Sequence, residues 1–506
     1  MASKWFFAIF VLTLCIQRFS FAQLPIKWSA VNEGSESDAQ FLIASTNNKT
    51  YVLNRKSGFL FRKDKWFVDV FNDSTLKKDN EEELIFLHKQ EQIQETFCLK
   101  NSSYLFANRY KNNIKTLSAY AIHENGRTQC IDSALVEIKN LESRNDYSFH
   151  LYQSRDSSKL CVFHFTPNPD VDEKPLQIDL FDSSMHKLAS QTVLLPFKNR
   201  ETYFLDAISV NDKAAFFLKV ADDDKMHVFT IKTYSYYIVE CNISNATSNI
   251  ISLNLSKKST VLGSSFYLDK NNNFGICGFH KFTTDKNDAV VKPFIHKMAS
   301  SIGTANFADD YAQPNVSLNI IKDNNPYNYE PLLTYTLNDG KVMMVSEKSY
   351  VETSCITDYR SGIQRCNFYY HKDNIDGYLF DDTNDTKRKF LIAKKQISIN
   401  DDGYFLGATG GLVNGSLFFI YNDSKKNLAA QQPKDEPHYM NSAKKANVVI
   451  AKVDANGNVT KQTLFTNVGS KTVFVPNKSM MYSNGKVVLY CKRNNKYTIG
   501  IGHIQK

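Results

Sequence analysis

The sequence lacks the residue patterns that mark the common enzyme and metal-binding classes. Its cysteines include no C-x-x-C pair, its eleven histidines include no H-x-x-x-H or H-E-x-x-H, and G-x-S-x-G is absent. Zinc ribbons, thioredoxin-like redox proteins, helical zinc proteases and α/β-hydrolases are therefore not indicated. The boxes of sialidases and the repeats of WD and kelch propellers are also missing. We predict no catalytic residue and no metal ligand, and enzymatic activity is not expected.

Glycine, proline and tryptophan are scarce, with 20, 12 and 3 residues in 506. Collagen-like and low-complexity chains, which are rich in glycine or proline, are thereby excluded. Hydrophobic residues make up 42% and charged residues 22%, as in a globular protein. Phe, Tyr, Val, Ile and Thr are abundant, and Asn occurs mostly in turn-like clusters. This composition is typical of an all-β protein with many Asx turns.

Long apolar runs are absent beyond the first residues, so we predict no integral membrane segment in the mature chain. The start of the chain has Lys4, an apolar stretch Trp5–Ile16, and small residues Ser20 and Ala22 ahead of Gln23. This pattern predicts a signal peptide over 1–22 and export to the periplasm, cell surface or extracellular space. An N-terminal membrane anchor, or lipidation at Cys15, is the alternative.

The formal net charge is +9, or +7 without the predicted signal peptide, and the basic residues are scattered. Their densest cluster, Lys387–Lys389, stands beside Asp381, Asp382 and Asp385. A nucleic-acid-binding protein concentrates its positive charge on one face or helix. We therefore expect no nucleic-acid partner.

Eight cysteines remain after the signal peptide, an even number that permits disulfides in an exported chain. One pairing follows from the sequence. Cys355 and Cys366 lie directly opposite each other in a hairpin that turns at Arg360–Ser361, close enough to form a bond. We predict this disulfide and leave the other six cysteines unassigned: Cys98, Cys130, Cys161, Cys241, Cys277 and Cys491.

Alternation of apolar and polar residues dominates from residue 40 to the end and predicts short strands. The predicted strands are 41–44, 51–54, 59–62, 66–71, 448–453, 459–465, 486–492 and 497–504. Residues 80–95 are polar and predict a loop or one short helix. Residues 425–445 predict an insertion between strands.

Weak repeats organise these strands. Asn271–Gly278 is similar to Asp401–Ala408 at an offset of 130 residues, and the turn Glu124–Gly126 is similar to Ala455–Gly457 at an offset of 331. Both are near multiples of about 65 residues, the length of a four-stranded unit, although the turns at 338–340 and 483–485 do not fit this period. The sequence predicts one domain over 23–506, a β-propeller of about seven four-stranded blades; two β-sandwich domains are the alternative.

The C-terminal residues 446–465 (ANVVIAKVDANGNVTKQTLF) and 475–502 carry a strand, a DANGN turn, a returning strand and a final strand pair. This arrangement resembles the end of uncharacterised exported β-propeller-like proteins of Bacteroidetes. The resemblance implies a propeller and export, but no activity, because none is known for the group.

Three further motifs have modest signals. Gly407–Gly411 lacks the Lys-Ser/Thr and the helix of a phosphate loop and predicts a tight turn or a close approach of backbones. Asp454, Asn456 and Asn458 match the start of a calcium loop, but Phe465 stands where its last glutamate would be and the run lies between strands. We therefore predict an Asx-stabilised turn, with weak calcium binding as the alternative, and expect no other cofactor. Twelve N-x-S/T sequons, including Asn101, Asn254 and Asn414, leave a eukaryotic glycosylated origin open.

These observations predict an exported, non-catalytic binding or scaffold protein of the cell envelope, whose partner is an unknown protein or glycan. The alternative is an extracellular glycan-active enzyme on a propeller scaffold, which would need two carboxylates placed across one site.

Overall fold

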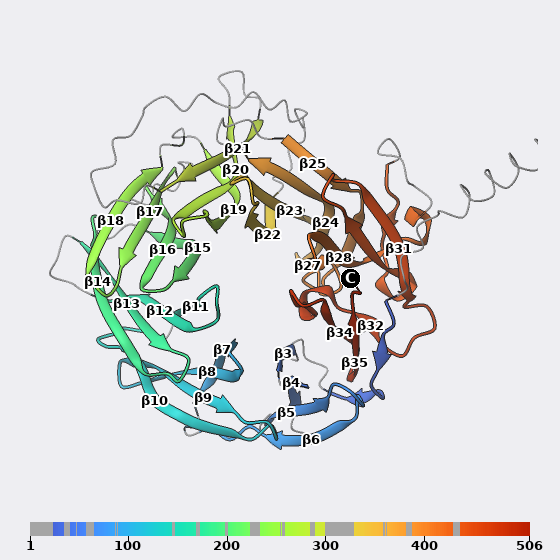
Figure 1. Cartoon of the computed structure of the whole chain (residues 1–506), viewed down its shortest axis with the longest axis horizontal. Helices are drawn as coiled ribbons and strands as arrows, with labels where there is room; N and C mark the ends of the chain where they lie inside the picture. Colours follow the sequence, from blue (N-terminus) through green and yellow to red (C-terminus); the bar gives the residue numbers. More distant parts are fainter. Residues whose placement is uncertain are drawn as a thin grey trace, which may run out of the picture.

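The computed structural model describes residues 24–505 apart from 35–40, 47, 57–64, 87, 89, 144–146, 168–172, 198–200, 223–232, 254, 256–258, 284–288, 299–327, 358–359, 361, 381–386 and 429–435. The predicted signal peptide and the predicted strand 59–62 lie outside the described residues. Apart from three short 3-10 helices, the regular elements of the described residues are all β-strands. They form eight sheets arranged as a ring (Figure 1).

The first four blades follow the chain, and each has four antiparallel strands in sequence order. Blade 1 consists of β3 (Phe41–Thr46), β4 (Lys49–Lys56), β5 (Lys65–Asn72) and β6 (Lys78–Glu83). Blade 2 consists of β7 (Gln92–Leu99), β8 (Ser102–Lys111), β9 (Ile114–Ile122) and β10 (Thr128–Ile138). Blade 3 consists of β11 (His150–Gln153), β12 (Lys159–Phe165), β13 (Lys174–Asp182) and β14 (Lys187–Leu195). Blade 4 consists of β15 (Thr202–Val210), β16 (Lys213–Ala221), β17 (Tyr234–Asn242) and β18 (Thr247–Leu253).

The next three blades are less regular. Blade 5 has β19 (Thr260–Leu268), β20 (Phe274–Thr283) and β21 (Ala289–Lys297). Blade 6 has β22 (Asn328–Thr336), the long strands β23 (Val342–Thr357) and β24 (Gln364–Phe380), then β25 (Lys387–Ile392) and β26 (Lys395–Ile399), joined by β29 (Tyr439–Met440). Blade 7 has β27 (Ala408–Val413), β28 (Ser416–Asp423), β30 (Asn447–Val453) and β31 (Val459–Thr466). The predicted insertion between β28 and β30 carries β29 and the helices η1 (Lys425–Leu428) and η2 (Ala443–Lys445).

Blade 8 closes the ring by joining the two ends of the described chain. Its C-terminal part is β32 (Val473–Phe474), η3 (Pro476–Lys478), β33 (Met480–Met481), β34 (Lys486–Arg493) and β35 (Lys496–His503). The N-terminal strands β1 (Lys27–Trp28) and β2 (Asn32–Glu33) pair with the outer edge of β35. The innermost strand of each blade contacts that of the next around the whole ring, and β3 contacts β34 to complete it. The predicted all-β propeller is therefore confirmed, with eight sheets where the sequence predicted about seven.

The hydrophobic core is divided among the blade interfaces. Eight buried clusters lie one between each pair of neighbouring blades, including one between blades 8 and 1. Val52 of β4 packs toward blade 8, whereas Leu53 beside it packs toward blade 2. Because both faces of each sheet are buried, consecutive residues in the middle of the inner strands are all buried, as in β4, β16 and β34.

The region 80–95, predicted as a loop or short helix, is instead partly strand, and this prediction was wrong. Residues 78–83 form the outermost strand β6, and β7 begins at Gln92. An outermost strand keeps its backbone ladder while its side chains face water or ion partners, as Glu83 does with Lys65 at 2.8 Å. Its sequence, KDNEEE, therefore shows no apolar alternation.

The antiparallel order gives the ring two different faces. One face carries the turn between the first and second strands of each blade and the turn between its third and fourth strands, and we call it the turn face. We call the opposite face the loop face. The first-to-second-strand turns of all eight blades contain a residue with positive φ: Asn48, Lys100, Ser157, Asn211, Asn272, Gly340, Asn414 and Gly485. These residues recur every 52 to 74 positions, which is the period of the blades.

This period shows which of the predicted sequence repeats occupy equivalent positions in different blades. Gly126 and Gly457, at φ of 86° and 88°, occupy equivalent third-to-fourth-strand turns in blades 2 and 7, five units apart as predicted. Gly340 and Gly485 also occupy equivalent turns, although their spacing had not fitted. By contrast, residues 269–273 form a turn on the turn face and 401–407 lie on the loop face before β27, so that predicted repeat was wrong.

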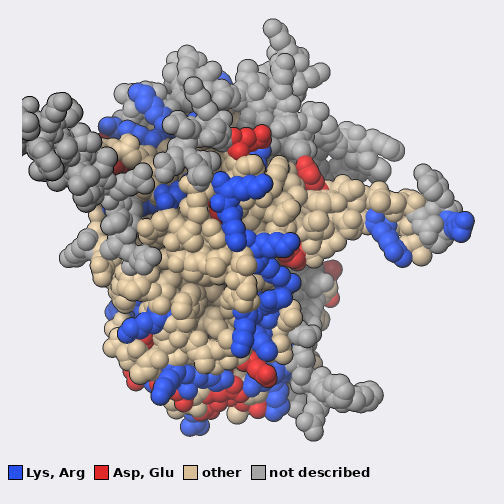
Figure 2. Space-filling model, turned by 90° about the vertical axis from the view of Figure 1, so that its right-hand side faces the viewer, with Lys and Arg blue, Asp and Glu red and all other residues tan. Residues whose placement is uncertain are grey.

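Charge is uneven on the side of the ring at the right of Figure 1. Figure 2 shows Lys and Arg side chains in a band down this side, with Asp and Glu gathered at its lower end, where β6 lies. The absence of a nucleic-acid partner stays a prediction. Among the described residues, no helix is long and apolar enough to cross a membrane.

Candidate functional site

A pocket of about 790 Å³ opens on the loop face close to the axis of the ring. Three consecutive blades form it, because the ring closure brings blade 8 beside blades 1 and 2. Its walls come from blade 1 (Ile43, Arg55, Trp66), the residues 91–96 of blade 2, and the residues 477–480 of blade 8. Its volume is in the range of small-molecule sites.

The blade 1 wall presents an aromatic ring with a cation above it. Arg55, near the end of β4, is directly opposite Trp66, near the start of β5. The guanidinium carbon of Arg55 lies 5.8 Å from the centre of the Trp66 ring, which is a cation–π distance. This pairing fixes the two side chains at the loop-face end of the blade.

The blade 2 wall contains one fixed carboxylate and one exposed carboxylate. Glu91 is buried and accepts hydrogen bonds from the Ser118 and Tyr120 hydroxyls, each at 2.7 Å, and from the His88 amide at 2.9 Å. Its oxygens are thus occupied inside the protein, and it anchors the start of β7. Glu95 is exposed, and it follows a β-bulge at Gln94 that re-aims this part of the strand.

The blade 8 wall is held by the Ser479 hydroxyl. It donates to the Val475 carbonyl and accepts from the Tyr490 amide, both at 2.9 Å. Asn477 is exposed beside it at the mouth of the pocket. The pocket therefore combines one indole ring, a guanidinium, amide groups and an exposed carboxylate on a rigid frame.

A second polar group lies away from the pocket, on the wall that the innermost strands form around the axis of the ring (the axial wall). Asp206, on the innermost strand β15, accepts hydrogen bonds from the Phe266 amide at 2.9 Å and the Ala207 amide at 2.8 Å. Burial raises the pKa of Asp206 to about 6, although these amides oppose the shift. Burial, together with the charge of Asp206, raises the pKa of Tyr152 to about 12.

A buried ion pair in blade 6 is structural. The Lys394 ammonium contacts Glu347 at 2.8 Å and donates to the Lys372 carbonyl at 3.1 Å and the Gln396 side chain at 3.0 Å. All three ammonium protons are therefore used. Lys394 sits between β25 and β26, where the outer chain shifts from one half of β24 to the other, and it fills that junction.

The turn considered for calcium has its carboxylate engaged locally. Asp454 Oδ1 accepts from the Asn456 and Asn458 amides, and Oδ2 accepts from the Asn458 side chain, all at 2.9 Å. No group of three or more His, Cys, Asp or Glu suited to a metal occurs among the described residues. Weak calcium binding stays a prediction.

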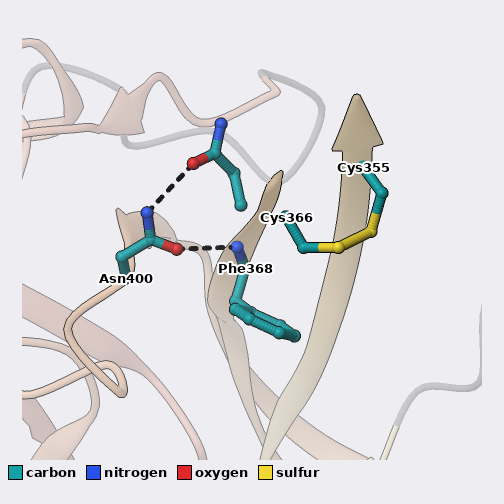
Figure 3. The surroundings of a disulfide bond; sticks show 5 residues. Cys355, Cys366, Phe368 and Asn400 are labelled. Carbon is teal, nitrogen blue, oxygen red and sulfur yellow. Dashed lines mark hydrogen bonds between the residues drawn. A yellow bond between two sulfur atoms is a disulfide. The ribbon is translucent and has the colours of Figure 1, made fainter. Parts of the chain in front are cut away.

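The predicted disulfide is present and lies away from the pocket. Cys355 and Cys366 are opposite each other on β23 and β24, with their Cα atoms 4.0 Å apart (Figure 3). The outer halves of these strands form a hairpin arm, defined as 351–369, in which residues 351–357 are all exposed. Asn400 secures its base, because its side chain accepts from the Phe368 amide at 2.8 Å and donates to Asn367 at 3.0 Å (Figure 3).

No residue of the pocket was predicted as a site residue from the sequence. Trp66 is one of three tryptophans in the sequence, but no motif around it marks a binding site. The contribution of residues 477–480 could be found only from the ring closure, because they lie almost 400 positions away from the other walls.

Comparison with known proteins gave neither a matching family model nor a matching curated protein. Among solved structures, the chain is similar to the β-propeller domain of the Trilobed protease from Pyrococcus furiosus, with 12% identity over 85% of this chain and 97% of that one, at a TM-score of 0.34. It is also similar to the WD40 domain of SCAP from fission yeast (9% identity, 96% and 95% covered, TM-score 0.37). A third likeness is to the endo-arabinase from Bacteroides thetaiotaomicron (10% identity, 55% and 99% covered, TM-score 0.26). The assignment as a propeller rests on the eight sheets and their closed ring.

Proposed function

We propose that the protein is an exported, non-catalytic binding protein that holds a glycan at the loop-face pocket. The observation that carries this proposal is the wall of Arg55 and Trp66 beside exposed polar side chains. An indole ring stacks on the apolar face of a sugar, while guanidinium, amide and carboxylate groups pair with its hydroxyls.

The pocket supports binding better than catalysis. Hydrolysis of a glycosidic bond usually uses two carboxylates across the bond. Here Glu91 is occupied by three internal donors, which leaves Glu95 as the exposed carboxylate among the residues that line the pocket. A rigid scaffold with polar loops is also a common platform for recognition.

Oligosaccharide arrays followed by calorimetry test the proposal. We expect a glycan that binds without turnover, and Trp66→Ala to weaken its affinity at least about tenfold, as for loss of a stacking aromatic group. Tyr439→Ala is the matched control, because Tyr439 is an exposed aromatic residue under Lys395 at 5.1 Å and lies outside the pocket. Equal loss in both variants would contradict the pocket as the site.

The alternative, a glycan-active enzyme, is favoured by the raised pKa of Asp206 on the axial wall, since a protonated carboxyl is what a general acid needs. Chromogenic glycosides, assayed with calcium and then with chelator, distinguish the two functions. Turnover above about 1 s⁻¹ that is lost in Asp206→Asn would overturn the binding proposal.

A further inference from the structure

The N-x-S/T sequons are distributed unequally between the two faces of the ring. Nine of the twelve fall on described asparagines; Asn254, Asn315 and Asn384 lie outside them. Seven of the nine stand in or beside the tight turns of the turn face: Asn48, Asn72, Asn101, Asn242, Asn245, Asn414 and Asn458. The other two, Asn422 and Asn477, are on the loop-face side.

Five of the seven turn-face asparagines are exposed, namely Asn48, Asn101, Asn245, Asn414 and Asn458. They come from blades 1, 2, 4 and 7, so they are spread around the ring. Only Asn48 and Asn414 have positive φ, a conformation that favours asparagine for its own sake. Backbone geometry therefore does not explain asparagine at the other three positions. Asn458 also donates from its side chain to Asp454 at 2.9 Å, and a glycan would leave one Nδ2 proton for that bond. At two of these sequons the hydroxyl residue, Thr247 or Thr460, is exposed as well.

Asn422 provides the contrast, because its side chain is completely enclosed. Its Nδ2 donates to the Phe405 and Phe474 carbonyls, each at 2.9 Å, and its Oδ1 accepts from Asn467 at 2.8 Å. A sugar on Nδ2 would replace one of its two protons, break one of the bonds to the carbonyls and find no room in the fold. Sequons that the fold can accept thus lie mainly on one face.

We propose that the turn face is an N-glycosylated surface, with oligosaccharides on Asn48, Asn101, Asn245, Asn414 and Asn458. The proposal rests on the export part of the proposed function, because N-glycan transfer occurs on exported chains. In the transfer, Nδ2 bonds to the anomeric carbon of a lipid-diphosphate-linked oligosaccharide and loses one proton. The bond between that carbon and the diphosphate oxygen breaks, and the lipid diphosphate leaves with the electron pair.

Glycans on the turn face would leave the loop face as the open surface for partners. The pocket, the hairpin arm and the insertion between β28 and β30 all lie on that side. The glycans would thereby exclude a partner from the turn face by steric bulk, so that it approaches the pocket from the loop face. Asn477 is the exception, since it is exposed at the pocket mouth.

The experiment secretes the full chain from insect cells, once with its own residues 1–22 and once with an unrelated leader. Enzymatic deglycosylation in heavy-oxygen water and peptide mass spectrometry then identify each modified asparagine. We expect at least three of the five turn-face asparagines to be occupied and Asn422 to be unmodified. Occupancy of two or fewer, or a glycan on Asn422 in the folded secreted protein, overturns the proposal.

Thr247→Ala and Thr460→Ala supply matched variants, because each removes one sequon at an exposed position and leaves the asparagine in place. Each is expected to lose the mass of one glycan and to keep the unfolding temperature of the parent. No loss of mass in a variant whose asparagine is occupied in the parent counts against the proposal.

The two leaders separate this proposal from the proposed function. If only the unrelated leader gives secreted protein, native export fails and the glycosylated surface, which rests on export, fails with it. If both leaders give secreted protein whose turn face stays unmodified, export stands and the glycosylated surface alone is overturned. If Asn477 is occupied together with the turn face, the surface stands, whereas the proposed use of the pocket is contradicted.

Discussion

At the scale of single residues, the unusual side chains are ionisable groups that are buried, because such groups normally lie in water. Lys394 and Glu347 are both almost fully buried, and their ion pair is compensated by the carbonyl of Lys372 and the side chain of Gln396. Asp206 is different, because two backbone amides hold it on the axial wall and its burial still favours the protonated form. Neither group could be recognised from sequence, since both depend on strands from different parts of the chain.

Asp206 makes stability depend on pH in a defined window. Its folded pKa of about 6 lies above the unfolded value of about 3.9. The folded state therefore binds more protons, and its stability falls as pH rises from about 4 to about 6. At 1.36 kcal/mol per pKa unit the whole shift corresponds to about 3 kcal/mol, of which about 2 kcal/mol is lost between pH 4 and pH 6, and we expect Asp206→Asn to remove this part of the pH dependence. Urea unfolding at pH 4 and pH 6 measures the change, and identical slopes in both proteins would contradict it.

At the scale of elements, the strands were more predictable than their places in the ring. The run of Val, Ile and Ala at 448–453 and the Val, Thr, Leu and Phe residues at 459–465 predicted β30 and β31 to within a residue, because β-branched and apolar side chains favour strands. The blade repeat was harder to see, since the same turn position is filled by Asn48, Lys100 or Gly340. What recurs is a positive φ at this turn position, not one residue type. The sequence indicates such a position only where it holds glycine or asparagine.

The hairpin arm is expected to behave separately from the ring. Its residues 351–357 are exposed, so the disulfide restrains the arm and not the core. The double variant Cys355→Ser/Cys366→Ser should be cut faster by trypsin at Arg360 and Arg365 within the arm. The loop entropy, about 3 kcal/mol for a loop this short, would be lost locally, and the unfolding temperature should stay within a few degrees. Thermal unfolding of both proteins checks this, and a fall of ten degrees or more would show that the arm belongs to the core.

At the scale of the whole molecule, the ring closure creates the candidate pocket. The sequence predicted the propeller from local alternation, but the meeting of 477–480 with blades 1 and 2 depends on the complete circuit. Deletion of residues 24–34 should therefore lower the unfolding temperature and lead to self-association through the uncovered edge of β35. Calorimetry and size-exclusion chromatography measure both effects. Exposed Lys27, changed to Ala, is the control, and a stable monomeric deletion variant would contradict the prediction.

The pairing of β1 and β2 with β35, called the clasp below, also determines how the ring would respond to a pulling force on its two ends. Force applied to the two ends acts across a few backbone pairs, the Trp28–Phe465 ring contact at 5.0 Å and the bonds between Ser29 and Ile499. Both ends belong to blade 8, so while the clasp holds the load passes chiefly between β1, β2 and β35, with side contacts to Phe465 of blade 7 and to Asn54 of blade 1. The ring is therefore expected to open first by separation of β1 and β2 from β35, with the seven remaining blades still folded.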